Sequence, residues 1–137
     1  MTLMHYLNGA EKAGASGRAQ DVFNPATGQP VTSVPLASTD EVNAAVAAAS
    51  AALPNWSATP AAKRAQVMFN FRDLVRANLD ELARLISSQH GKTFDDAKGE
   101  MARGLEVVEF ACGIPQALKG EYSPQVAGGV DVFSMRQ

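Results

Sequence analysis

The spacing of hydrophobic and polar residues changes along the chain, and its first 36 residues are dominated by turn signals. The segment Tyr6-Leu7-Asn8-Gly9 contains an Asn-Gly pair, which is typical of a two-residue hairpin turn. A second turn is expected at Asn24-Pro25-Ala26-Thr27-Gly28, where proline presets φ and glycine can adopt a positive φ. Val31, Val34 and Leu36 then fit a returning strand. The pattern predicts an N-terminal β-hairpin over residues 5–36.

From residue 38 to residue 120 the apolar residues recur at the 3.6-residue period of a helix, and capping signals divide this region into about four helices. Ser38 and Glu41 fit a capping box at the start of the first helix, which Pro54 is expected to end. Thr59 followed by Pro60 resembles a cap residue and a first helical position, so a second helix is expected to begin there.

The third and fourth predicted helices are separated by a short stop signal. The third is expected to begin near Asn78 and to end at Gly91, a residue that can adopt the left-handed conformation of a helix C-terminus. The fourth is expected to begin at Thr93, with acidic residues favourably placed near its positive end. Residues 113–115, Gly-Ile-Pro, should kink or restart this helix, and Gly120 should end it.

The C-terminal part of the chain returns to a strand pattern. Residues 121–129 are expected to form a loop because they include Pro124 and the Gly128-Gly129 pair. Residues 130–137 alternate weakly and predict a final strand, which would need a partner from further sequence or from another subunit. The fold class is therefore an α-rich segment flanked by a β-hairpin and a strand, forming one incomplete domain over residues 1–137.

Composition and charge narrow the class of protein. The chain has 137 residues, 46% of them hydrophobic, which argues against wholesale disorder. Its 12 basic and 14 acidic residues give a net charge of −2 with no basic stripe, so nucleic-acid binding is not expected. No apolar run approaches a membrane span of about 18 residues, and residues 1–17 resemble neither a secretory signal nor a transit peptide. With a single cysteine, Cys112, a cytoplasmic protein is expected.

Glycines that resemble nucleotide-binding motifs have simpler interpretations. Gly91-Lys92-Thr93 resembles the end of a phosphate-binding loop, but that loop needs a glycine at position 86, which is Ile. A helix stop followed by the next helix cap is the better interpretation. Gly99 and Gly104 fall inside a helical pattern instead of a strand-to-helix turn, so they make no dinucleotide fingerprint. They are expected to allow close packing against another element.

The reactive side chains form no assembled active site. Cys112 lies on the apolar stripe of the fourth predicted helix without a base, a cation or a helix N-terminus to stabilise a thiolate, so a buried, inert thiol is expected. His5 and His90 lack metal-ligand spacing with each other or with Cys112, so no metal site is expected.

The order of these segments resembles the aldehyde dehydrogenase superfamily, which has an α/β fold. The resemblance extends from about Tyr6 to Gln137 and is carried by Tyr6–Gly9, Phe23–Gly28, Thr39–Val42, Trp56, Arg64 and His90–Lys92. A more specific stretch, Gly104–Pro115, is similar to the segment that characterises the CoA-dependent branch, the methylmalonate-semialdehyde dehydrogenases.

This resemblance implies that the chain is the beginning of a longer, oligomeric enzyme. The enzyme would convert malonate or methylmalonate semialdehyde, NAD and CoA to acetyl-CoA or propionyl-CoA, CO₂ and NADH. The family's oxyanion-holding Asn, its phosphate-facing Gly motif and its catalytic Cys would lie beyond Gln137, and Cys112 does not match the nucleophile's motif. We therefore expect the isolated chain to be inactive and to bind no cofactor, and we expect homo-oligomers to form through the strand at 130–137.

Arg103 is the one candidate substrate-binding residue. The resemblance aligns it with the arginine that the family uses to bind the substrate's carboxylate, and a guanidinium can hold a carboxylate through two hydrogen bonds. The alternative is an exposed arginine on a solvated helix face, paired with Glu100 or Glu106. For the whole chain the alternative function is a standalone helical interaction module that derives from the same family and has no catalytic activity.

Overall fold

The computed structural model describes residues 2–136, so Met1 and the last position of the predicted final strand, Gln137, lie outside the described residues. The chain begins with two antiparallel strand pairs: β1 (His5–Leu7) with β2 (Ala10–Lys12), and β3 (Ala19–Phe23) with β4 (Pro30–Pro35). The predicted N-terminal hairpin structure over residues 5–36 is confirmed in its strands and turns, but it consists of two hairpins instead of one, because each of the two turns closes its own two-stranded sheet.

Both predicted turns lie at the tips of these strand pairs. Asn8 and Gly9 have φ angles of 51° and 76°, as the mirror-image turn of a tight hairpin requires. In the turn between β3 and β4, the Asn24 side chain accepts a hydrogen bond from the backbone N–H of Ala26 at 2.9 Å, and Gly28 has a φ of 69°. Local turn chemistry thus places both loops.

The first helix, α1 (Thr39–Ala58), begins with the predicted capping box. The Ser38 hydroxyl accepts a hydrogen bond from the backbone N–H of Glu41 at 3.2 Å. In return the Glu41 carboxylate accepts one from the backbone N–H of Ser38 at 2.7 Å. These two bonds satisfy amides that a helix N-terminus leaves without an intrahelical partner.

The prediction that Pro54 ends α1 is wrong, because the helix continues through it to Ala58. A proline in a helix interior removes one backbone hydrogen bond and commonly kinks or ends the helix, but here the chain stays helical for four more residues. Side-chain hydroxyls bind carbonyls of the last turn: Ser57 Oγ donates to the carbonyl of Pro54 at 3.0 Å, and Thr59 Oγ1 donates to that of Asn55 at 2.9 Å. Thr59 is therefore the C-cap of α1, and Pro60 is the N-cap of the next helix.

The remaining helices follow the predicted stops closely. They are α2 (Ala61–Ala77), α3 (Leu79–His90), α4 (Phe94–Cys112) and the short α5 (Ile114–Ala117). The breaks at Asn78, at Gly91 and Thr93, and at Gly113 are confirmed. The four long helices and the flanking strands confirm an α-rich segment, and α5 ends three residues before the predicted Gly120.

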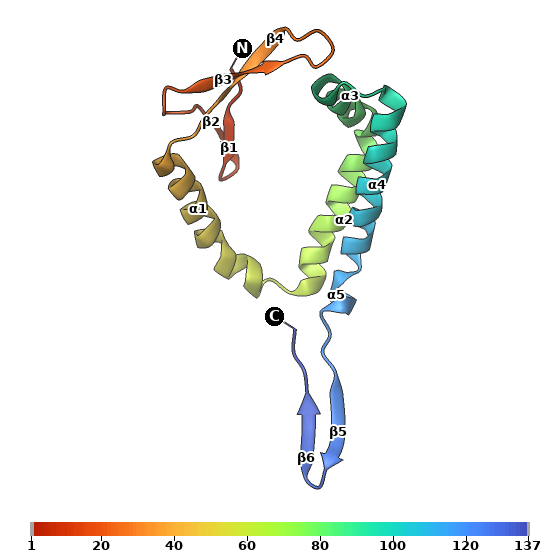
Figure 1. Cartoon of the computed structure of the whole chain (residues 1–137). Coiled ribbons are helices and arrows are strands. Elements are labelled where there is room, and N and C mark those ends of the chain that lie inside the picture. Colours follow the sequence, from red (N-terminus) through yellow and green to blue (C-terminus); the bar gives the residue numbers. More distant parts are fainter. Residues whose placement is uncertain (1, 137) are drawn as a thin grey trace.

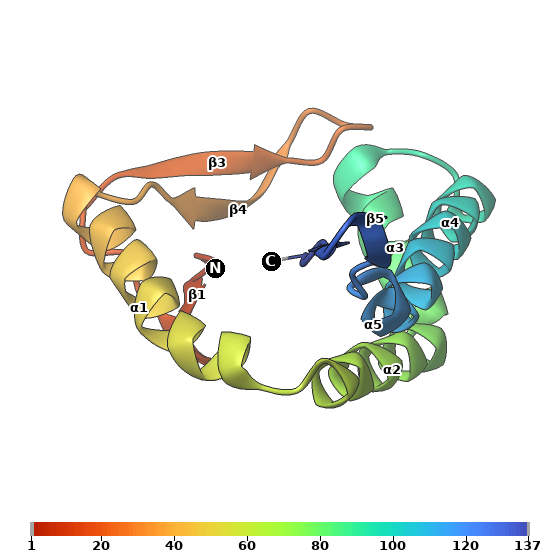
Figure 2. The same cartoon turned by 90° about the horizontal axis from the view of Figure 1, so that it is seen from below.

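The buried core is small and lies among α2, α3 and α4. Its members are Ala65, Val75, Ala83, Ala97 and Cys112. By contrast α1 has no buried residue, and Figures 1 and 2 show it on the opposite side of the molecule from α2, α3 and α4. Large apolar side chains such as Leu53, Val107 and Phe110 are therefore exposed, at 61%, 68% and 78%. Such surfaces are typical of faces that another element covers.

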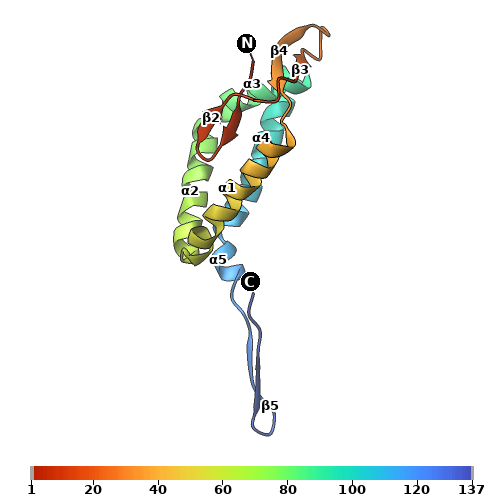
Figure 3. The same cartoon turned by 90° about the vertical axis from the view of Figure 1, so that its left-hand side faces the viewer.

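The C-terminal strand has a partner within this chain, so the prediction of a lone strand and of a loop over 121–129 is wrong. β5 (Tyr122–Ala127) pairs with β6 (Val130–Phe133) in an antiparallel hairpin that projects from the helices (Figures 1 and 3). The Gly128-Gly129 pair forms its turn, and Gly129 has a φ of 74°. Every residue of both strands is exposed.

Candidate substrate-binding site

The connection between α3 and α4 forms one side of the candidate site. Gly91 ends α3 in the left-handed conformation, with a φ of 86°, and Thr93 caps α4 by accepting a hydrogen bond from the backbone N–H of Asp96 at 3.3 Å. Lys92 lies between these two caps, so its backbone is held from both sides. The Gly-Lys-Thr sequence is thus a helix stop and a helix cap, as predicted, and no phosphate-binding loop.

Arg103 lies on the exposed side of α4, two to three turns after its N-terminus. It lines a surface hollow formed by the loop before α4 and by the first half of that helix. The lining residues are Lys92, Asp95, Asp96, Gly99, Glu100 and Arg103. The hollow combines a guanidinium and an ammonium group with carboxylates. Whether it can bind an anion therefore depends on which of the two cations is not already paired with a carboxylate.

Two carboxylates of α4, those of Glu100 and Glu109, are paired with cations other than Arg103. Lys92 Nζ lies 3.0 Å from Glu100 Oε2, and Arg76 of α2 places its Nη2 atom 2.7 Å from Glu109 Oε1. Within residues 2–136 the Arg103 guanidinium has no ion-pair partner. The expected pairing of Arg103 with Glu100 or Glu106 is therefore not formed in the described part of the chain.

Lys92 is the residue of this hollow that the sequence analysis did not single out for the site. In the sequence it belongs to the false phosphate-binding motif Gly91-Lys92-Thr93 and to the segment His90–Lys92 that contributes to the family resemblance. The available signal was a lysine held between a helix stop and a cap, with an acidic residue eight positions later on the next helix. That signal becomes specific only once the loop geometry is known.

The other candidate residues of the sequence analysis lie apart from this hollow. Cys112 is 8% exposed at the end of α4, a buried thiol as predicted. Gly99 and Gly104 lie inside α4, as predicted, but a Cβ added at either would meet nothing within 4 Å. The expectation that they allow close packing is therefore wrong for the described residues.

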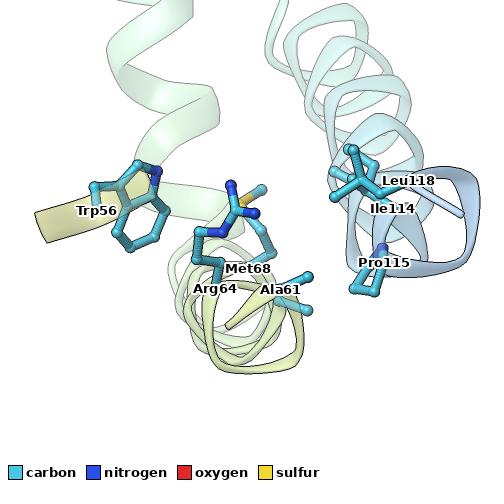
Figure 4. Close-up of a pocket in the computed structure, with 9 residues that line it drawn as sticks. Trp56, Ala61, Arg64, Met68, Ile114, Pro115 and Leu118 are labelled. Atoms are coloured by element: carbon cyan, nitrogen blue, oxygen red, sulfur yellow. The ribbon is translucent and has the colours of Figure 1, made fainter. Parts of the chain in front are cut away.

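A second hollow lies where α1, α2 and α5 meet, and it is mostly apolar. Figure 4 shows Trp56 of α1 on one side, Arg64 and Met68 of α2 in the middle, and Ile114 of α5 on the other side. The Arg64 side chain donates a hydrogen bond from Nε to the carbonyl of Thr59 at 3.1 Å, which ties it to the turn between α1 and α2. The residues that line this hollow provide apolar contacts, and none of them is a nucleophile or a general base.

The described residues 2–136 contain neither a metal-binding cluster nor a membrane-spanning helix. In that part of the chain, no group of three or more His, Cys, Asp or Glu side chains is placed to hold a metal ion. The helices described there include none long and apolar enough to cross a bilayer.

Comparisons with known proteins match this chain over nearly all of its length. The model of the aldehyde dehydrogenase family matches residues 12–137. A malonate-semialdehyde dehydrogenase of Pseudomonas aeruginosa is 49% identical over 133 residues, which cover 97% of this chain and 27% of that protein. A mitochondrial, acylating methylmalonate-semialdehyde dehydrogenase of Arabidopsis thaliana is 49% identical over 117 residues, covering 85% of this chain and 19% of that protein.

The solved structures agree with the sequence relatives. A protein described as a methylmalonate-semialdehyde dehydrogenase from Sinorhizobium meliloti 1021, solved in complex with NAD, superimposes with a TM-score of 0.93 at 47% identity. The match covers 100% of this chain and 28% of that one. This chain therefore spans about a quarter of the length of the relatives that it matches.

Proposed function

Because the chain belongs to the aldehyde dehydrogenase family, we propose that it forms the N-terminal part of a CoA-acylating enzyme that oxidises malonate or methylmalonate semialdehyde. The observation that carries the proposal is the 49% identity to the malonate-semialdehyde dehydrogenase of Pseudomonas aeruginosa over 97% of this chain. The exposed apolar faces of α1 and α4 support a segment that further sequence covers.

Within this proposal Arg103 binds the carboxylate of the substrate. It is an exposed guanidinium that has no ion-pair partner in the described residues, and it lines a hollow at the surface of α4. A bidentate contact with a carboxylate would use the planar fork of the side chain and would orient the aldehyde group at the other end of the substrate. Arg103 contributes binding and orientation, and it supplies no nucleophile.

The relatives imply NAD and CoA as cofactors of the complete enzyme, and the residues described here do not supply the glycine-rich phosphate turn of a dinucleotide site. The usual dinucleotide fingerprint places the phosphates at a glycine-rich turn between a strand and a helix. The glycines at 99 and 104 lie inside α4 instead, and Gly91 lies between two helices. We therefore derive no step through either cofactor, and we propose that the isolated chain is inactive because one arginine cannot replace a nucleophile and an oxyanion site.

We also propose that the complete enzyme is a homo-oligomer that uses the β5–β6 hairpin. Both strands are exposed over their whole length, and their outer edges carry unpaired backbone groups that can pair with another chain. The same hairpin would serve the alternative function, a standalone helical interaction module. The expected cytoplasmic location stays a prediction.

The test compares the 137-residue chain with a chain extended beyond Gln137 to the length of the relatives. NAD- and CoA-dependent oxidation of malonate and methylmalonate semialdehyde is measured for both. We expect turnover only in the extended chain. Turnover by the short chain would contradict the assignment of the catalytic groups to later sequence, and inactivity of both with these substrates would contradict the proposed substrate class.

The role of Arg103 is tested in the extended, full-length enzyme. Arg103→Ala should lower kcat/KM for the carboxylated semialdehydes by about 10- to 100-fold, the value of a lost charged hydrogen bond. A simple aldehyde such as propanal should be oxidised as before. Arg76→Ala, which removes a guanidinium that pairs with Glu109, is the matched control and should leave the ratio between the two substrates unchanged. Equal losses on both substrates in the Arg103 variant would contradict the role.

A further inference from the structure

We propose that Lys92 is a positioning residue for Arg103: it holds the carboxylate of Glu100, which would otherwise neutralise the guanidinium. This inference rests on the proposed function, in which Arg103 binds the substrate's carboxylate. The two cations have different tasks. Arg103 contacts the substrate, and Lys92 acts on it only through Glu100.

The contact that carries the inference is the ion pair between α4 and the loop before it. Lys92 Nζ lies 3.0 Å from Glu100 Oε2, and the lysine side chain is 19% exposed whereas the glutamate side chain is 51% exposed. The lysine is therefore the more enclosed partner. Its backbone is fixed by the left-handed Gly91 before it and the helix cap Thr93 after it, so the fold itself sets where this ammonium group lies.

Glu100 is the natural competitor for Arg103. Residues three positions apart on a helix are neighbours on its surface, and an acidic residue placed before a basic one forms such pairs readily. Glu100 and Arg103 have this spacing, and both line the same hollow. No ion pair between them is found among residues 2–136, where Glu100 is paired with Lys92 instead. Lys92 thus occupies the carboxylate that is best placed to pair with Arg103.

The remaining charges around the hollow do not provide the same effect. Asp95 and Asp96 lie in the first turn of α4, near the positive end of the helix dipole, and Thr93 accepts a hydrogen bond from the Asp96 backbone. Glu106 lies three residues after Arg103 and does not line the hollow. Lys92 is the other cation among the lining residues, so removal of its charge would leave Glu100 free to turn towards Arg103.

The experiment uses the full-length enzyme and four variants that separate pairing from net charge. Lys92→Met should raise KM for malonate semialdehyde by roughly three- to tenfold, as expected for a charged competitor at a partly exposed site. Its kcat and its KM for propanal should stay within about twofold of the wild type, because the competitor acts on carboxylate binding alone. The double variant Lys92→Met/Glu100→Gln should return KM to the wild-type value. Lys92→Met/Glu106→Gln carries the same net charge as that double variant and should stay impaired.

Lys92→Arg keeps a cation opposite Glu100 and should retain the wild-type KM, which also covers the case in which Lys92→Met does not fold. A wild-type KM in Lys92→Met, equal rescue by both double variants, or an impaired Lys92→Arg would each overturn the inference. Arg103→Ala, assayed in parallel, separates the two proposals. If it loses carboxylate selectivity while Lys92→Met does not, only the role of Lys92 fails. If it keeps selectivity, the proposed role of Arg103 fails and the role of Lys92 falls with it.

Discussion

Pro25, in the turn between β3 and β4, lies directly against Gly91, the residue that ends α3. A Cβ atom on residue 91 would lie 3.1 Å from Pro25 Cγ and 3.3 Å from Pro25 Cβ. The two residues are far apart in the sequence, and their contact joins the N-terminal strands to the connection that carries Lys92. Figure 1 shows the turn of this strand pair reaching over towards the end of α3.

This contact predicts that Gly91→Ala will destabilise the protein for two separate reasons. An alanine at a φ of 86° would be strained by roughly 1–2 kcal/mol, and its methyl group would be too close to Pro25. Gly28→Ala is the matched control, because its φ is 69° but an added Cβ would meet nothing within 4 Å. In urea unfolding of the full-length enzyme we expect a larger loss for Gly91→Ala than for Gly28→Ala. Equal losses would show that Pro25 moves aside without cost.

The capping box of α1 predicts a pH dependence of stability. The backbone N–H of Ser38 and that of Ala15 each donate a hydrogen bond to the Glu41 carboxylate, both at 2.7 Å. These bonds, with that of Ser38 first, lower the pKa of Glu41 from 4.5 to about 2. A lowered pKa means that the unfolded chain binds the proton more tightly than the folded one does. The stabilisation is therefore complete above about pH 4.5 and is lost as the pH falls towards about 2.

Glu41→Gln should flatten this part of the stability profile, because the amide cannot lose a proton. The measurement is the unfolding midpoint of wild type and variant from about pH 6 down to about pH 2, which covers the interval between the two pKa values. Glu81→Gln is the control, since Glu81 occupies the third position of α3, where no side-chain cap forms. A profile for Glu41→Gln as steep as that of the wild type would show that other carboxylates govern the acid transition.

The packing of α3 on α4 predicts a steric limit at Ala97. Ala83 and Ala97 are both 0% exposed, and the two helices pack against each other. Ala97→Leu would add three carbon atoms where there is no free space, so we expect a loss of roughly 1–3 kcal/mol in the free energy of unfolding. Ala102→Leu, on the exposed side of the same helix, should change it by less than about 0.5 kcal/mol. Wild-type stability of Ala97→Leu would contradict close packing at this position.

The capping and turn residues were the part of the fold that the sequence predicted best, because their chemistry is local. Ser38 with Glu41, Gly91 and Thr93 each act on amides or carbonyls within four residues, and the structure places helix ends at all of these positions. Pro54 misled the prediction, because the hydroxyls of Ser57 and Thr59 bind carbonyls of the turn that follows it.

β5 was missed for a similar reason. Pro124 lacks a backbone donor and suggested a loop, but the pairing with β6 is irregular between Ser123 and Ala127, so the proline does not interrupt a regular ladder. The ion pairing within the hollow also could not be predicted from the sequence. That Lys92, instead of Arg103, is paired with Glu100 depends on the orientation of one loop relative to α4, and no residue pattern encodes this orientation.

The two faces of the β5–β6 hairpin differ, and the difference predicts which of them meets another subunit. Tyr122 lies opposite Phe133, and its hydroxyl donates a hydrogen bond to Asp131 at 2.6 Å, so this face carries a charged group that would be costly to bury. Side chains alternate along a strand, so Val130 and Val132 lie on the other face, 48% and 52% exposed. This apolar face is the better candidate for a subunit contact.

Val132→Asn should therefore weaken assembly of the full-length enzyme more than Phe133→Ser does. Loss of a fully buried valine corresponds to about 1.5–3 kcal/mol, or roughly a 10- to 100-fold weaker association. Sedimentation at a series of protein concentrations measures this directly. Dissociation in Val132→Asn with wild-type assembly in Phe133→Ser would assign the contact to the valine face, and the reverse result would assign it to the face of Tyr122. Unchanged assembly in both variants would mean that the hairpin does not join subunits, since either face would lose most of its apolar contact.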